Sequence, residues 1–225
     1  MTPIDVISAL RDSAGTAQIG DEMKKIAKPN AAVAVPVETA LILRTCNADM
    51  TSYGGFRWPT SGQVEAPDWN PAHVCGGGLH GLLWGEGSVQ YLNLSDDAKW
   101  IVFRALLSDV AHGTGELMDK CKARRGIVEL CGSRDEAIAF LIANGASGKM
   151  VVFGTATAGY RGTATAGDRG TVTAGMGGVI SILRWNGKRF KVRAAQVKEE
   201  DGDGELEPNI PYRLDNDGNW KVAIK

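Results

Sequence analysis

Residues 154–177 form three consecutive octads, GTATAGYR, GTATAGDR and GTVTAGMG, which differ at few positions. A period of eight with glycine at the corners is typical of short strands joined by tight turns. Side chains alternate between the two faces of a strand, so the alanines and Val172 share one face and the threonines share the other. The replacement of an alanine by Val172 indicates that this face is buried. The octads therefore predict a short β-solenoid with a core of methyl groups.

The segment TAGYRGTATAG resembles the central repeats of bacterial ice-nucleation proteins. In that family, outward Thr-x-Thr rows are thought to order water, so the resemblance implies an exposed threonine ladder. Stacked strands lie about 4.8 Å apart, which makes a ladder of three octads only about 10 Å long. We therefore expect the octads to form a structural wall and not an ice-templating face.

The seventh and eighth positions of each octad vary and should project from the corners of the solenoid. Tyr160, Arg161 and Arg169 occupy such positions, and we predict that they contact a partner. An open solenoid edge can pair with another chain, so a homo-oligomer through this edge is also expected.

The 225 residues include 44 % hydrophobic and 23 % charged residues, with a net charge of −1. This is an ordinary globular composition, and it gives no basis for binding to nucleic acid or to a membrane. No run of apolar residues is long enough to span a bilayer, and the first residues lack a secretory signal. The four cysteines are scattered and are expected to be reduced thiols, which predicts a cytoplasmic location in a bacterial host cell.

The order of predicted elements indicates an α+β fold in three parts. Residues 1–36 should form N-terminal helices and a linker, and residues 37–150 a mixed, β-rich domain with strands at 39–46, 99–106 and 123–131. The capping box of Ser133 and Glu136 starts a helix. Residues 151–225 should hold the octad solenoid and two C-terminal hairpins, which turn at Asn186-Gly187 and Asp217-Gly218.

A second distinctive segment, CGGGLH, places Cys75 and His80 five residues apart. With Cys46 and Cys131 these residues could supply four zinc ligands, or Cys75 and His80 could form a nucleophilic pair. Zinc sites usually show a close ligand pair, which is absent here, and no oxyanion motif stands out. We therefore expect no metal and no cofactor, with His80 as a hydrogen-bonded structural residue.

The pattern GGFRWPTSG, CGGGLHG, WIVFRALLSDV and DKCKARRGIVELCG resembles a group of phage and prophage proteins. The resemblance covers about residues 40–185 and rests on Cys75, on Gly78-Leu79-His80, on Asp109-Val110, and on Lys122 with Arg124. It implies an architecture and a phage-linked context, but no reaction.

Two further groups of residues are candidates for function. Arg44, His80 and Glu129 loosely resemble the layout of an ADP-ribosyltransferase, which would make the protein an enzyme with a nucleotide cofactor. Trp58, Trp69 and Trp84 would mark a binding pocket if they are exposed together. The basic run Lys120–Arg125 could bind phosphate or form a solvated strand face.

The leading interpretation is a non-catalytic binding protein with a protein partner. On the phage resemblance, one form of this function is an inhibitor of a host defence system. The alternative is the nucleotide-cofactor enzyme built around the GLH segment.

Overall fold

The computed structural model describes residues 37–223, and the predicted helices and linker of residues 1–36 lie outside the described residues. Residues 39–132 supply a seven-stranded antiparallel sheet in the order β2-β7-β4-β1-β3-β6-β5. Its long central strands are β1 (Thr39–Cys46), β4 (Lys99–Leu106) and β7 (Arg125–Gly132). The shorter strands are β2 (Gly62–Glu65), β3 (Leu79–Leu83), β5 (Val110–His112) and β6 (Cys121–Ala123).

Both faces of this sheet are buried, which explains why β1 and β4 are nearly continuous apolar runs. Leu41, Leu43 and Val102 face one cluster together with the helix α2 (Arg134–Leu141). Ile42 and Phe103 face a second cluster under the loops of residues 50–70. Short 3-10 helices lie in the connections, at Tyr53–Gly55, Val89–Tyr91, Leu107–Asp109 and Gly115–Leu117.

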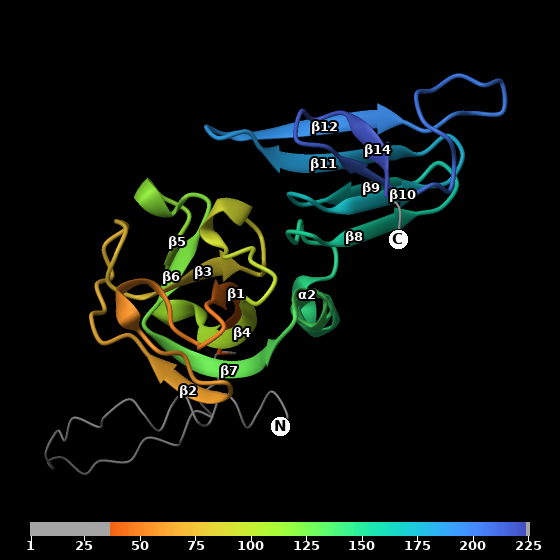
Figure 1. Ribbon diagram of the computed structural model, residues 1–225. Coiled ribbons are helices and arrows are strands. Elements are labelled where there is room, and N and C mark those ends of the chain that lie inside the picture. The colour runs from red at the N-terminus through yellow and green to blue at the C-terminus, as the bar shows by residue number, and fades with distance from the viewer. Residues whose placement is uncertain (1–36, 224–225) are drawn as a thin grey trace, which may run out of the picture.

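The helix α2 begins with the predicted capping box. The Ser133 side chain accepts a hydrogen bond from the backbone N–H of Glu136, and the Glu136 carboxylate accepts one from the backbone N–H of Ser133. The helix continues into a π-turn at Ile142–Ala146, where the Asn144 side chain donates to the carbonyl of Phe140 at 2.8 Å. In Figure 1, α2 lies between the seven-stranded sheet and the octad strands.

The octad strands are divided between two further sheets. Strands β8 (Thr155–Ala158) and β10 (Thr171–Ala174) pair in parallel in one sheet, and β9 (Thr163–Ala166) and β11 (Val179–Trp185) pair in parallel in the other. The first sheet is completed by the antiparallel strands β13 (Tyr212–Leu214) and β14 (Trp220–Val222), and the second by β12 (Phe190–Gln196). The two predicted C-terminal hairpins are therefore β11–β12 and β13–β14.

The predicted fold class is wrong. The described chain is β-rich with one α-helix of eight residues, so it is not an α+β fold, and the octads do not form a solenoid. Each octad contributes one short strand, and successive strands alternate between two sheets whose remaining members pair antiparallel. The period of eight fixes the strand length and the turn, but it does not fix what a strand pairs with.

The predicted facing of the octads is confirmed for the second and third repeats. Ala164, Ala166, Val172 and Ala174 are buried in a cluster between the two sheets. The corresponding Ala156 and Ala158 are only half-buried, because β8 is the edge strand of its sheet. The threonines of β8 and β9 are exposed and those of β10 are half-exposed.

No helix among the described residues is both long and apolar enough to cross a membrane.

Candidate functional site

A cavity of about 500 Å³ lies beside the seven-stranded sheet, on the face that holds Phe103. It is bordered by Arg44 on β1, by His80 on β3 and by a glycine-rich loop that we call the Gly76–Gly78 loop. Aromatic rings, a cationic Lys120 and an acidic Asp68 complete its wall. This volume lies within the usual range for small-molecule sites.

Arg44 is the most unusual group in the wall. Its guanidinium lies 4.4 Å from the centre of the Trp58 ring, and its Nη1 donates to the carbonyl of His80 at 3.2 Å. A second donation goes to the carbonyl of Thr45, and no carboxylate forms an ion pair with Arg44 among the described residues. Burial lowers the pKa of Arg44 to about 10, so the side chain is still cationic at neutral pH. Arg44 is thus a cation that contacts carbonyl oxygens and an aromatic ring, and no anionic group in the described part of the chain balances its charge.

His80 is held in its neutral form. Burial is the largest cause that lowers its pKa to about 4. The positive charges of Lys120, Lys122 and Arg44 act in the same direction. The Nε2 atom of His80 is buried and has no hydrogen-bond partner among the described residues. The low pKa therefore reflects the burial of His80 first and the positive charges around the cavity in addition.

Lys122 and Glu116 hold the Gly76–Gly78 loop in place. Lys122 is fully buried, and its Nζ donates to the carbonyls of Val74 and Gly76 at 2.9 and 2.8 Å. Burial lowers the pKa of this lysine. The Glu116 carboxylate accepts a hydrogen bond from the backbone N–H of Cys75 at 2.7 Å. The loop is thus fixed from the strand side and from the solvent side.

Gly77 in this loop cannot be replaced without strain. Its φ is +59°, and a Cβ atom there would lie 2.8 Å from the carbonyl oxygen of Asp68. The loop approaches the cavity closely because no side chain intervenes.

Lys120 and Tyr91 form the opposite side of the opening. The Lys120 ammonium lies 4.6 Å from the centre of the Tyr91 ring and 3.2 Å from the Cys75 sulfur. The Tyr91 hydroxyl donates to Asp119 at 3.0 Å. Sequence reasoning missed Tyr91, because no local signal connects a loop residue to a cavity formed by distant strands.

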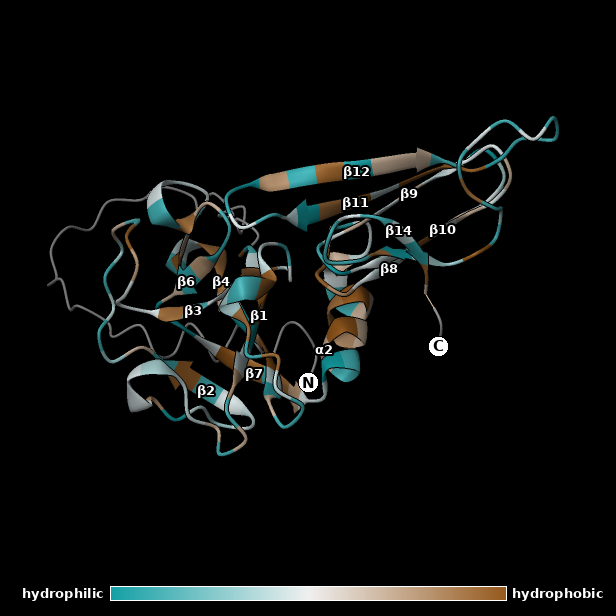
Figure 2. Cartoon of the chain, turned by 45° about the horizontal axis from the view of Figure 1, so that its top comes forward, coloured by the Kyte–Doolittle hydropathy of each residue, from teal (hydrophilic) through white to brown (hydrophobic). Residues whose placement is uncertain are grey.

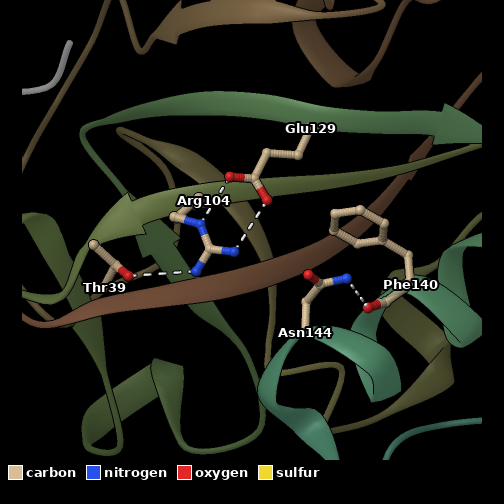
Figure 3. Close-up of polar contacts among 5 residues, drawn as sticks. All are labelled: Thr39, Arg104, Glu129, Phe140 and Asn144. Atoms are coloured by element: carbon tan, nitrogen blue, oxygen red, sulfur yellow. Dashed lines mark hydrogen bonds and ion pairs between the residues drawn. The ribbon is translucent and has the colours of Figure 1, made fainter. Parts of the chain in front are cut away.

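The structure does not bring Glu129 to His80 and Arg44. The Glu129 carboxylate receives two hydrogen bonds from Arg104, at 2.8 and 3.1 Å (Figure 3). Arg104 lies opposite Leu41 in the ladder, and so on the face away from Trp58. The ion pair is therefore a structural contact on the other side of the sheet.

The three predicted tryptophans do not form an exposed group. Trp58 is 2 % exposed, packs against Phe103 and borders the cavity. Trp69 is half-buried against the same cluster, whereas Trp84 packs on the opposite face of the sheet. Trp58 alone of the three borders the cavity.

The cysteines are free thiols in separate surroundings. Cys46 and Cys121 are buried, Cys131 lies with its sulfur 3.7 Å from that of Met50, and Cys75 is exposed beside Lys120. Between residues 37 and 223, no three His, Cys, Asp or Glu side chains are placed to hold a metal ion.

The predicted corner residues of the octads lie at opposite ends of β9. Tyr160 is 63 % exposed, and Arg161 stacks on its ring at 5.1 Å and pairs with Glu199 at 3.4 Å. Arg169 lies at the other end and borders a groove together with Arg134 and Phe153.

Comparison with known proteins finds a family model that matches part of the chain and relatives that match a stretch of it. Residues 40–131 match the family model described as "Domain of unknown function (DUF7666)". An ice nucleation protein of Xanthomonas campestris pv. translucens is 36 % identical over 108 residues, which is 48 % of this chain and 7 % of that protein. Ice nucleation protein InaU of Pantoea ananas is 48 % identical over 65 residues, 29 % of this chain and 6 % of that protein.

An ice nucleation protein of Pseudomonas syringae is 40 % identical over 74 residues, 33 % of this chain and 6 % of that protein. The chain thus spans less than a tenth of the length of these relatives. No solved structure matches it significantly. The chain contains a DUF7666 domain and repeats homologous to those of ice nucleation proteins.

Proposed function

We propose that this protein is a non-catalytic binding protein whose cavity takes an anion that carries an aromatic ring. The observation that supports this most strongly is the Arg44 cation, which is half-buried at the cavity wall without a carboxylate partner. An anionic ligand group would supply the missing counter-charge, and charge-assisted hydrogen bonds to arginine are among the stronger contacts in proteins. Phe56 and Tyr91 offer ring surface to the rest of such a ligand.

The arrangement of polar groups argues for binding and against catalysis. Glu129 is occupied by Arg104 on the other face of the sheet. His80 is neutral, and its Nε2 is buried rather than open to the cavity. The curated relatives are named for ice nucleation, which is not an enzymatic reaction, although the likeness covers little of their length. Nothing in the comparisons supports a phage origin or the inhibition of a host defence system, so neither is part of the proposal.

Isothermal titration calorimetry with adenosine monophosphate tests the proposal, with adenosine and inorganic phosphate as partial probes. We expect the monophosphate to bind more tightly than either part. Arg44→Met should weaken binding by about 10- to 100-fold, the loss expected for one charge-assisted hydrogen bond. Arg124→Met, which changes an exposed arginine paired with Glu65, is the matched control and should leave the affinity unchanged.

Lys120→Met provides a second variant, in case Arg44→Met does not fold. Binding that is equal in the wild type and in a folded Arg44 or Lys120 variant contradicts the proposal. Conversion of the nucleotide, followed by phosphorus NMR over the titration, would show that the protein is an enzyme.

A further inference from the structure

The octad region carries two exposed patches of opposite charge. The first, the basic hairpin, consists of Lys188 and Arg189 in the β11–β12 turn with Lys191 and Arg193 on β12. The second, the acidic loop, spans residues 199–205 and exposes four carboxylates, those of Glu200, Asp201, Asp203 and Glu205. Both patches lie outside the proposed binding cavity, and the inference below does not depend on that cavity.

The basic hairpin has no counter-charge of its own. Its four cations are all exposed, and none forms an ion pair with another described residue. Residues 184–193 contain no acidic residue at all. In the ladder Arg184 lies directly opposite Lys191, and like charges in such a position destabilise a sheet. The Arg184 side chain instead reaches the β13–β14 turn, where it donates a hydrogen bond to the carbonyl of Asn216.

The acidic loop likewise has carboxylates that no cation of the described chain neutralises. Arg161 pairs with Glu199 and Lys198 pairs with Glu207, which leaves the four carboxylates between them without an ion pair among the described residues. Backbone hydrogen bonds hold the loop in a defined shape, since the N–H of Glu199 donates to the carbonyl of Asp203 at 2.7 Å and that of Gly202 to Glu199 at 3.0 Å. The carboxylates therefore project from an ordered turn.

The β11–β12 turn, which holds Lys188 and Arg189, and the acidic loop lie at opposite ends of β12, as Figure 1 shows. The seven residues of β12, about 23 Å of strand, separate Lys188 and Arg189 from the acidic loop, so these charges cannot neutralise each other within one chain. The outer strand also exposes apolar surface between the charges, with Val192 67 % exposed, and hydrophobic and hydrophilic residues alternate along it in Figure 2.

We propose that a second copy of this chain docks its acidic loop on the basic hairpin. Four unpaired cations on one patch match four unpaired carboxylates on the other. The contact joins two different surfaces, so it is head-to-tail and leaves a free patch at each end, which permits rings or chains of copies. Complementary charge of this kind mainly sets the partner and the rate of association, so the contact is weak and sensitive to salt.

The alternative partner for a basic hairpin is nucleic acid. The observations favour a second copy because the same strand ends in an acidic loop, which would repel a polyanion that extends along β12. Positive charge on an edge strand also discourages sheet pairing, but that role does not account for the acidic loop.

Sedimentation velocity of the full chain at low and high salt tests the proposal. Between about 0.01 M and about 1 M salt the Debye length falls from about 30 Å to about 3 Å. We expect association at low salt that disappears at high salt. Lys188→Glu with Arg189→Glu should give a monomer at low salt, and so should Glu200→Lys with Asp201→Lys. Arg57→Glu with Lys99→Glu changes the net charge by as much as the hairpin variant, at exposed sites elsewhere, and should still associate.

The decisive sample is an equimolar mixture of the hairpin variant and the loop variant. In that mixture each reversed patch meets its new complement, so association should return although each variant alone is monomeric. A wild-type protein that stays monomeric at low salt contradicts the proposal. So does a mixture that stays monomeric while the wild type associates. Binding of a labelled single-stranded DNA by the monomer, lost in the hairpin variant, would assign the patch to nucleic acid instead.

Discussion

The seven-stranded sheet and the octad sheets are stabilised in different ways. In the seven-stranded sheet, the fully buried side chains are large, and they include Phe103, Leu41 and Ile101. In the octad sheets, the corresponding positions are alanines with one valine, Val172, completed by Ile180 and Ile182 of β11. Buried apolar area per strand is therefore much smaller in the octads, and their geometry must depend on the backbone.

The turns of the octads show how the backbone does this. Residues 153, 161, 169 and 177 are spaced by eight, and all have φ between 52° and 68°. Each precedes a glycine whose N–H donates to the carbonyl three residues earlier. A positive φ at the third residue and this hydrogen bond define a type II turn. The same turn thus recurs every eight residues, and the turn at Phe153 precedes the first octad.

The largest expected effect concerns the core of the seven-stranded sheet. Phe103→Ala should lower the free energy of unfolding by about 3–5 kcal/mol, because it leaves a cavity beneath Trp58. Chemical denaturation measures the change. Ala166→Gly, which removes the only side-chain carbon at a buried octad position, should cost about 1 kcal/mol. Equal costs would show that the octad core is as important as that of the larger sheet.

A smaller loss of stability is expected when a glycine in the octad turns is replaced. A Cβ atom on Gly170 would lie 2.6 Å from that of Ala166 and 2.8 Å from the carbonyl oxygen of Gly154. Gly170→Ala should therefore destabilise by about 1–3 kcal/mol through overpacking. Gly159→Ala, where a Cβ would meet nothing within 4 Å and φ is not positive, is the control for space alone. If Gly170→Ala is neutral in thermal melts, close approach of the backbone does not shape the turns.

Arg169 should be a site where stability increases. Its φ of 58° costs a residue with a side chain about 1–2 kcal/mol. A glycine avoids this cost, but its greater freedom in the unfolded chain cancels part of the gain. Arg169→Gly should raise the free energy of unfolding by about 0.5–1 kcal/mol. Arg169→Ala keeps the Cβ atom and should give no such gain. A gain in both variants would mean that the side chain, rather than the backbone, is unfavourable.

The last expected effect depends on pH and belongs to the seven-stranded sheet. The folded state holds the pKa of His80 near 4, whereas an unperturbed histidine titrates near 6.5. Between these values the unfolded chain binds the proton and the folded chain does not, so stability falls as pH decreases from about 6.5 to about 4. Denaturation curves of His80→Gln should show a flatter dependence in this window. Parallel curves for the two proteins would contradict the burial of a neutral His80.

Much of the fold could be predicted where the signal is local. The strands at 39–46 and 99–106, the capping box at Ser133 and the Asn186-Gly187 hairpin lie where the sequence places them. Residues 149–153 include an apolar run before the octads, but they form a turn and no strand. The N–H of Val152 donates to the carbonyl of Gly85, and Phe153 has a positive φ.

The site could be predicted only in part, because it depends on how strands pair. Arg44 and His80 are neighbours across β1 and β3, as their spacing on two strands allows. Glu129 does not join Arg44 and His80. The β4–β7 ladder shifts register beside it, and its carboxylate contacts Arg104 on the face of the sheet away from the cavity. No residue pattern reveals such a shift before the pairing of the strands is known.

An NMR titration with adenosine monophosphate tests most directly the claim that binding belongs to the seven-stranded sheet and not to the octads. Backbone amide shifts report where the ligand lies in the intact protein. We expect the largest changes at Arg44, at the Gly76–Gly78 loop and at His80, and no change along β8 and β9. Shifts confined to the octad strands, with the Gly76–Gly78 loop unchanged, would contradict the account.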